Sequence, residues 1–166
     1  MLTACSRVLG LVRECAYSYF FGIDPVFSAF RVAYMIPNLA RRLFGEGAMA
    51  SAFIPVFTEV LHKSGKERAR ELAGSALTAL GLFLAMLTLM AELGVAIGNL
   101  AHPAVTLKLT MVMLPYMVLI CLTAFAGGML NSLNRFGAPA AAPVILNVVI
   151  IGSIYGGSHL AGLSGL

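Results

Sequence analysis

Two adjacent arginines, Arg41 and Arg42, interrupt the otherwise apolar segment MIPNLARRLFGEG at residues 35–47. An arginine at mid-bilayer costs from about 2.5 kcal/mol to 10 kcal/mol or more unless it snorkels to the interface, pairs with a counter-charge or faces a water-filled cavity. Neighbouring residues on a helix point about 100° apart, so the two side chains cannot share one narrow face. We therefore expect one of the two to face a lumen.

The identity of the lumen-facing arginine depends on the helix around Pro37. The residues Arg31, Asn38 and Arg42 are spaced i, i+7 and i+11, which puts them on one face of an ideal helix. If the helix breaks at Pro37, Arg41 takes the position that the ideal helix gives to Arg42. Spacing alone leaves both alternatives open.

Two further arginines, Arg7 and Arg13, lie in the first apolar segment. Arg7 is near its start and is either an interfacial anchor or a cavity residue. Arg13 lies deeper, where snorkelling is harder, and the adjacent Glu14 partly neutralises it. Arginine presents a planar, permanently charged fork that matches two phosphate oxygens at once, whereas lysine does not. The buried arginines therefore predict a phosphorylated, anionic ligand.

The polar residues around the arginine pair each have two interpretations. Asn38 either contacts sugar or amide groups of the ligand or caps a helix end. Glu46 is either a counter-charge in an empty cationic cavity or a solvated residue between two glycines. Asp24, Glu46 and Glu92 are acidic candidates for a coupling ion, and the spacing favours none of them.

The sequence contains no recognised catalytic or cofactor motif. It has no Walker-type phosphate loop, no HExxH or CxxC motif and no supported Ser/His/Asp grouping. We therefore expect no metal, no cofactor and no enzyme activity. Transport without an ATP site would depend on an ion gradient, the membrane potential or a partner.

The composition is that of a membrane protein. Of the 166 residues, 60% are hydrophobic and 11% are charged, whereas soluble domains carry roughly 25% charged residues. The charged side chains cannot supply the polar shell that a soluble domain of this length needs. The net charge of +4 is scattered between apolar segments, so no nucleic acid is expected as a partner.

Apolar runs of about 20 residues, the length that crosses a bilayer, predict an all-α polytopic bundle of about five transmembrane helices. The expected helices cover residues 2–21, 26–61, 72–100, 105–130 and 140–155. The second run is too long for one straight span, and its expected breaks are Pro37 and the triplet at 45–47. The polar stretch 62–71 is expected to be a solvated loop or a helix start at the membrane surface. Its basic residues place the N-terminus in the cytoplasm.

The chain resembles the MurJ/MviN family of lipid II flippases, within the multidrug/oligosaccharidyl-lipid/polysaccharide exporter superfamily. The similar segments are SRVLGLVRE (6–14), FFG (20–22), AYMIPNLARRLFGEGAMASAFIPVF (33–57) and LPYMVLICLTAFAGGMLNSLNRFGAPAAAPVILNVVIIG (114–152). The resemblance implies that residues 1–166 are one transmembrane domain, namely helices 1–5 of a 14-helix transporter whose chain is cut at both ends. Its implied partners are membrane lipids, the missing C-terminal helices and lipid II.

The implied activity is translocation of lipid II, the undecaprenyl-pyrophosphate-linked peptidoglycan precursor, across the bacterial inner membrane by alternating access. The resemblance also implies that the family's cavity arginines are Arg7, Arg13 and Arg41, which favours Arg41 over its neighbour Arg42. Glu14 stands where the family usually has an acidic residue beside the second arginine.

Two positions depart from the family pattern. Ser28 stands where many members have a functional aspartate, and Arg31 replaces a common aromatic residue. We hypothesise that Asp24, one helical turn before Ser28, supplies the missing carboxylate.

Two other functions fit the same residues. One is export of another polyprenyl-linked glycan or a drug, since fold does not decide cargo. The other is a non-transporting membrane scaffold whose arginines bind anionic lipid head groups. A flippase needs Arg13 and Arg41 near mid-membrane and facing a common lumen, whereas a scaffold places them at head-group depth.

Overall fold

The computed structural model describes residues 2–22, 24–45 and 47–160, and within these ranges the only regular elements are helices. They are α1 (Leu2–Phe21), α2 (Pro25–Ala40), the π-helical turn η1 (Arg41–Gly45), α3 (Ala48–Ala101), α4 (Val105–Ser132) and α5 (Gly137–Leu160). The described segments Pro25–Ala101, Val105–Ser132 and Gly137–Gly156 are long and apolar enough to cross a membrane. The predicted all-α membrane bundle is confirmed.

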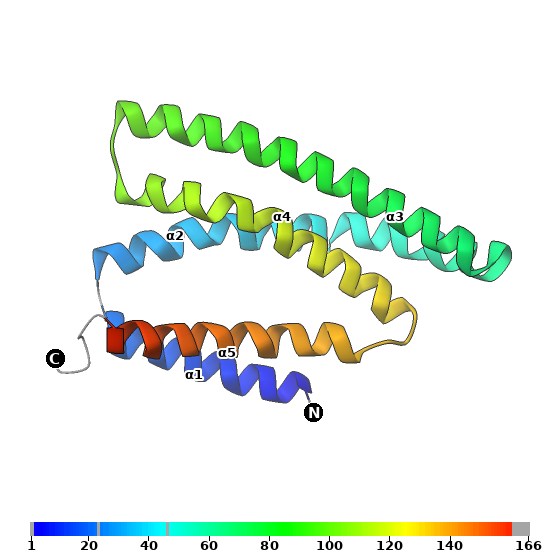
Figure 1. The fold of residues 1–166 in the computed structure, drawn as a ribbon, viewed down its shortest axis with the longest axis horizontal. Coiled ribbons are helices and arrows are strands. Elements are labelled where there is room, and N and C mark those ends of the chain that lie inside the picture. The colour runs from blue at the N-terminus through cyan, green and yellow to red at the C-terminus, as the bar shows by residue number, and fades with distance from the viewer. Residues whose placement is uncertain (1, 23, 46, 161–166) are drawn as a thin grey trace.

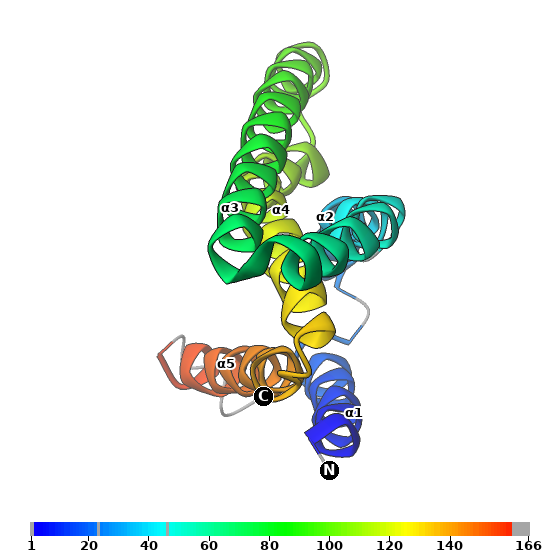
Figure 2. The same ribbon diagram turned by 90° about the vertical axis from the view of Figure 1, so that its right-hand side faces the viewer.

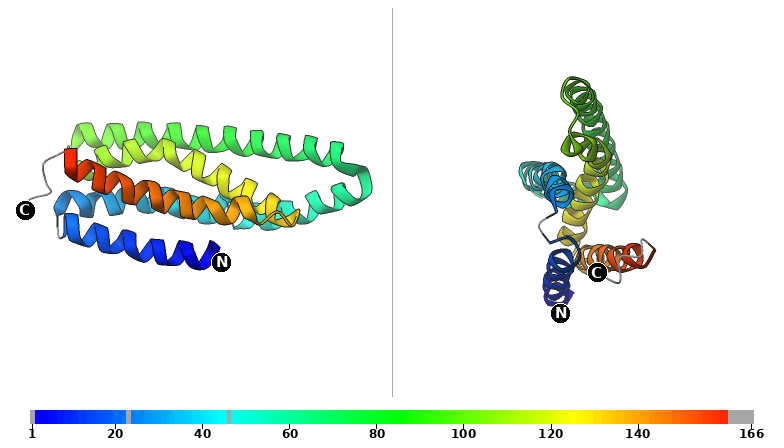
Figure 3. Two further views of the ribbon diagram at one scale, coloured as in Figure 1. Left: turned by 60° about the horizontal axis from the view of Figure 1, so that its bottom comes forward. Right: turned by 90° about the vertical axis from the view of Figure 1, so that its left-hand side faces the viewer.

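The helices form two groups. One group is the pair α1 and α5, which contact each other, and the other comprises α2, η1, α3 and α4 (Figure 1). Figure 2 shows the pair lying below the larger group, with α4 reaching down between them. The helix axes are roughly aligned, and successive helices run in opposite directions along them (Figure 3). This arrangement leaves α1 facing α2 across a space.

The helix α3 reverses direction at Gly65, so it supplies two antiparallel helices (Figure 1). Gly65 has φ 83° and ψ 178°, a combination that is essentially restricted to glycine. The predicted polar loop at 62–71 is thus the tip of a helical hairpin. All its side chains except Ala69 are exposed, and Lys63 pairs with Glu59 at 2.7 Å. The reversal separates the predicted helix at 26–61 from the predicted helix at 72–100.

The predicted break at Pro37 is wrong. Pro37 lies inside α2 and is buried, next to Ala33, which is fully buried on the same helix. A proline removes one helical hydrogen bond, and close packing against α4 holds α2 together in spite of that loss. The helix instead changes to a π-helical turn at η1. The predicted break at residues 45–47 is confirmed, since α3 begins at Ala48.

The core lies where η1 and α3 meet α4. Its buried side chains include Leu80, Leu84, Cys121 and Phe125. Gly45 approaches α4 so closely that a Cβ at this position would lie 2.6 Å from the Cβ of Ala124. The π-helical turn is therefore seated directly on the backbone of α4, and the position of the arginine pair depends on that contact.

Candidate functional site

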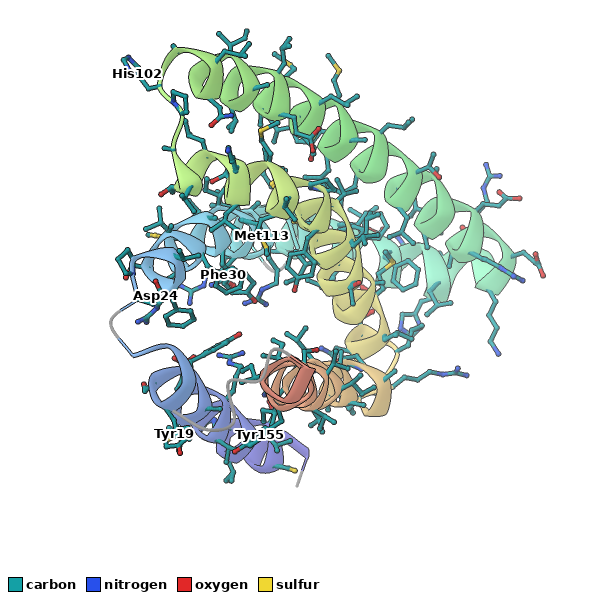
Figure 4. All side chains as sticks on the ribbon, turned by 60° about the vertical axis from the view of Figure 1, so that its left-hand side comes forward. Tyr19, Asp24, Phe30, His102, Met113 and Tyr155 are labelled. Carbon is teal, nitrogen blue, oxygen red and sulfur yellow. The ribbon has the colours of Figure 1, made fainter. Side chains whose placement is uncertain are left out.

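A pocket of about 490 Å³ lies in the space between α2 and the α1–α5 pair. Figure 4 shows Phe30 on the side of α2 that faces α1 and α5, and Asp24 at the start of that helix. The pocket is lined by Arg13, Glu14 and Tyr17 of α1, by Ile150 of α5, and by Phe27, Phe30, Arg31, Val32, Tyr34, Met35 and Asn38 of α2. Its lining combines two arginines and one glutamate with an apolar wall.

Arg13 is held by three groups. Its Nη2 donates to Oε1 of Glu14 at 2.9 Å and its Nη1 donates to Oδ1 of Asn147 at 3.1 Å, while its Cζ lies 6.0 Å from the centre of the Tyr17 ring. The side chain is 25% exposed. Its Nε is buried and has no hydrogen-bond partner among the described residues. A guanidinium in this setting keeps donors available for an acceptor that enters the pocket.

Asn147 connects α5 to α1. It is 5% exposed, and its amide nitrogen donates to the backbone oxygen of Ser6 at 3.2 Å while its amide oxygen accepts from Arg13. A polar amide within an apolar helix is stable only when both of its ends find partners. The two hydrogen bonds therefore fix the α1–α5 contact at the level of Arg13.

Arg41 occupies the first position of η1. Its Nε donates to Oδ1 of Asn38 at 3.3 Å, and Asn38 lines the pocket. The guanidinium is near enough to Tyr116 and Cys121 of α4 to interact with both electrostatically. Arg41 itself is half-buried and is not among the residues that line the pocket. It therefore borders the pocket through Asn38.

A row of aromatic rings joins the two arginine positions. Tyr17 lies 5.1 Å from Phe27, Phe27 lies 6.2 Å from Phe30, and Phe30 lies 6.1 Å from Tyr34 between ring centres. Tyr34 in turn stacks on Tyr116 of α4 at 6.2 Å. The row starts beside Arg13 and ends beside Arg41. Since its first four members line the pocket, one wall of the pocket is aromatic.

The other predicted site residues do not all meet here. Arg7, Ser28 and Arg42 are exposed and do not line this pocket. Arg42 lies one residue beyond Arg41 in η1, and the ideal-helix stripe that favoured Arg42 does not continue through the π-helical turn because a π-helix has more residues per turn. Glu46 lies outside the described residues.

Asp24 acts as the N-cap of α2. Its Oδ1 accepts from the backbone N–H of Val26 at 2.9 Å, and Pro25 follows it at the first helical position. An aspartate in this role satisfies a helix N–H and complements the helix dipole. The cap contributes to the local structure whether or not the carboxylate also has a role in transport.

The sequence reasoning missed Asn147 and the aromatic row. The signal for Asn147 was its place as the only amide between Ala140 and Tyr155 in an apolar span, since polar residues in such spans need a partner. The aromatic row was visible as Phe27, Phe30 and Tyr34 at spacings of three and four.

The chain is similar to known proteins over most of its length. A family model described as Lipid II flippase MurJ matches residues 17–162. The Lipid II flippase MurJ of Burkholderia cenocepacia is 37% identical over 95% of this chain and 33% of its own length. The Probable lipid II flippase MurJ of Rhizobium meliloti is 37% identical over 90% of this chain and 30% of its own length, and that of Treponema pallidum is 38% identical over 93% and 31%. The chain spans about a third of the length of these curated relatives.

Proposed function

The chain belongs to the MurJ family of lipid II flippases, and we propose that it is the N-terminal part of a flippase that moves lipid II from the cytoplasmic to the outer leaflet. The observation that carries the proposal is the Arg13 guanidinium in a pocket between apolar helices. Arg13 lies roughly 16 Å along α1 from Leu2, near the middle of the helix. A scaffold that bound lipid head groups at the surface would need no cation at this depth.

The pyrophosphate of lipid II is the proposed ligand of Arg13. A pyrophosphate offers several anionic oxygens, and a guanidinium binds two of them through parallel N–H bonds. When the pocket is empty, the Glu14 carboxylate pairs with Nη2 of Arg13 and lowers the desolvation cost of the positive charge. An entering pyrophosphate then competes with this carboxylate for Arg13.

Arg41 and Asn38 are proposed to bind the head group at the other end of the aromatic row. The Asn38 amide lines the pocket and carries donors suited to sugar or peptide groups. Arg41 orients that amide through the 3.3 Å contact and adds positive charge beside it. Arg31, on the exposed side of α2, adds a second cation to the pocket lining.

The proposed orientation has the N-terminus in the cytoplasm of a bacterial cell, with the bundle in the inner membrane. The hairpin tip of α3 and the turn between α4 and α5 lie toward the same end of the bundle (Figure 1). That end carries the basic residues Lys63, Lys66, Arg68, Arg70 and Arg135, as the positive-inside rule requires of a cytoplasmic face. The remaining helices of the full-length protein would supply the bundle against which this one moves.

Complementation tests the proposal. The full-length gene that contains this segment is expressed in a strain depleted of its own lipid II flippase, as wild type and as Arg13→Ala and Arg41→Ala. We expect growth with the wild type and loss of growth with both variants. Arg68→Ala, an exposed arginine at the hairpin tip, is the matched control and should support growth. Growth with Arg13→Ala at normal protein levels would remove the arginine from the mechanism.

A further inference from the structure

The amide of Asn147, on α5, hydrogen-bonds to two residues of α1, Ser6 and Arg13. It is buried, and it uses both ends of the amide: Oδ1 accepts from Arg13 at 3.1 Å and Nδ2 donates to the Ser6 oxygen at 3.2 Å. The second bond fixes the orientation of the amide, because a flipped amide would place its nitrogen against the Arg13 donor. The oxygen is thus presented to the guanidinium.

The two acceptors of Arg13 differ in charge. Glu14 is a carboxylate that is half-exposed, whereas Asn147 is neutral and buried. A carboxylate orients a guanidinium and also cancels its charge, whereas a neutral amide orients it and leaves the charge available. When an anion displaces Glu14 from the fork, the amide still holds Nη1.

We propose that Asn147 is a positioning residue that holds the Arg13 guanidinium toward the pocket in the geometry that binds the pyrophosphate of the head group. The inference rests on the proposed function. Asn147 does not line the pocket, so it acts through Arg13. Pre-orienting a long, flexible side chain removes part of the ordering cost of binding.

The experiment measures the dissociation constant of lipid II for the full-length protein in detergent micelles. The variants are Arg13→Ala, Asn147→Leu, Asn147→Asp and the double variant Arg13→Ala/Asn147→Leu. Asn131→Leu is the matched control, because Asn131 is exposed at the end of α4 and makes no side-chain hydrogen bond within the described chain. Thermal unfolding of each variant in the same detergent reports folding.

We expect Arg13→Ala to weaken binding about thirtyfold, as loss of a desolvated charge contact does. Asn147→Leu should weaken lipid II binding about five- to tenfold. The variant loses one hydrogen bond to the charged Arg13, and that loss affects the ligand only through the orientation of Arg13. The double variant should bind as Arg13→Ala does, because Asn147 acts only through that side chain. Asn131→Leu should bind as the wild type.

Asn147→Asp separates positioning from a purely structural role. Aspartate keeps the size of asparagine and the acceptor for Arg13 but cannot donate to the Ser6 oxygen. A purely structural role therefore predicts a lower unfolding temperature, with any loss of binding persisting when Arg13 is also replaced by alanine. If Asn147 orients Arg13 and leaves its charge available, Asn147→Asp should lose at least as much lipid II affinity as Asn147→Leu, because the new carboxylate neutralises Arg13. This variant also serves if Asn147→Leu does not fold.

Three results would overturn the inference. Wild-type affinity in Asn147→Asp is the first, and independent losses that multiply in the double variant are the second. In both cases the proposed function still stands if Arg13→Ala binds lipid II more weakly than the wild type. The third is wild-type affinity in Arg13→Ala, which removes the proposed phosphate site and the positioning role together.

Discussion

The seating of η1 on α4 at Gly45 gives a prediction with a calculable size. A Cβ at position 45 would lie 2.6 Å from the Ala124 Cβ and 3.1 Å from the Cys121 carbonyl oxygen, whereas ordinary contacts begin at 3.4 Å. A methyl group and a backbone oxygen cannot rotate away. In Gly45→Ala, η1 must therefore move away from α4 by nearly 1 Å, and Arg41 moves with it.

Overpacking of this kind costs about 1–3 kcal/mol. The lower backbone entropy of alanine in the unfolded chain offsets about 0.5–1 kcal/mol of that cost. We expect Gly45→Ala to lower the free energy of unfolding by about 1–2 kcal/mol, because the closest contact is much shorter than an ordinary van der Waals distance. Displacement of Arg41 should also weaken lipid II binding.

The assay is thermal unfolding of the full-length protein in detergent, together with lipid II binding. Gly94→Ala is the matched control, since a Cβ at Gly94 would meet nothing within 4 Å. Adding Ala124→Gly removes the atom at 2.6 Å, so in that background Gly45→Ala should cost about 1 kcal/mol less. If Gly45→Ala unfolds and binds lipid II as Gly94→Ala does, the close seating of η1 on α4 is refuted.

Three further predictions concern single positions. Asp24→Asn should impair growth in the complementation assay while thermal stability stays normal, because asparagine also caps helices; full activity would exclude a role for the carboxylate. Arg42→Ala should retain more lipid II binding than Arg41→Ala, because Arg42 is exposed and Arg41 contacts Asn38, and equal losses would contradict this difference. Gly65→Ala should destabilise the hairpin by about 1–3 kcal/mol because of its backbone angles, which thermal unfolding measures against Gly74→Ala, where a Cβ meets nothing within 4 Å.

The sequence determined the membrane class and the all-helical architecture. Uninterrupted apolar runs of bilayer length leave the backbone no alternative to helix, because each peptide group must find its hydrogen bond within the chain. The glycines at 45 and 47 also predicted the break before α3. The structure gives a reason for glycine at position 47, because a Cβ there would lie 2.5 Å from the carbonyl oxygen of Arg42. These features depend on residues that are close together in the chain, so they can be predicted from the sequence.

The fate of Pro37 and the choice between Arg41 and Arg42 depended on packing. Proline favours a kink, and the ideal helix placed Arg42 on the face of Asn38. Pro37 is buried within a continuous α2, and Arg41, at the start of the π-helical turn, is the arginine that donates to Asn38. A turn of this kind changes the angle between successive side chains, and its presence was not visible in the spacing.

The pocket and its positioning network were decided by tertiary structure alone. Arg13 and Asn147 are 134 residues apart in the chain, and only the pairing of α1 with α5 brings them together. Sequence showed that a charge inside an apolar helix must be compensated. It did not show which group compensates it, because that depends on which helices pack side by side and at what register.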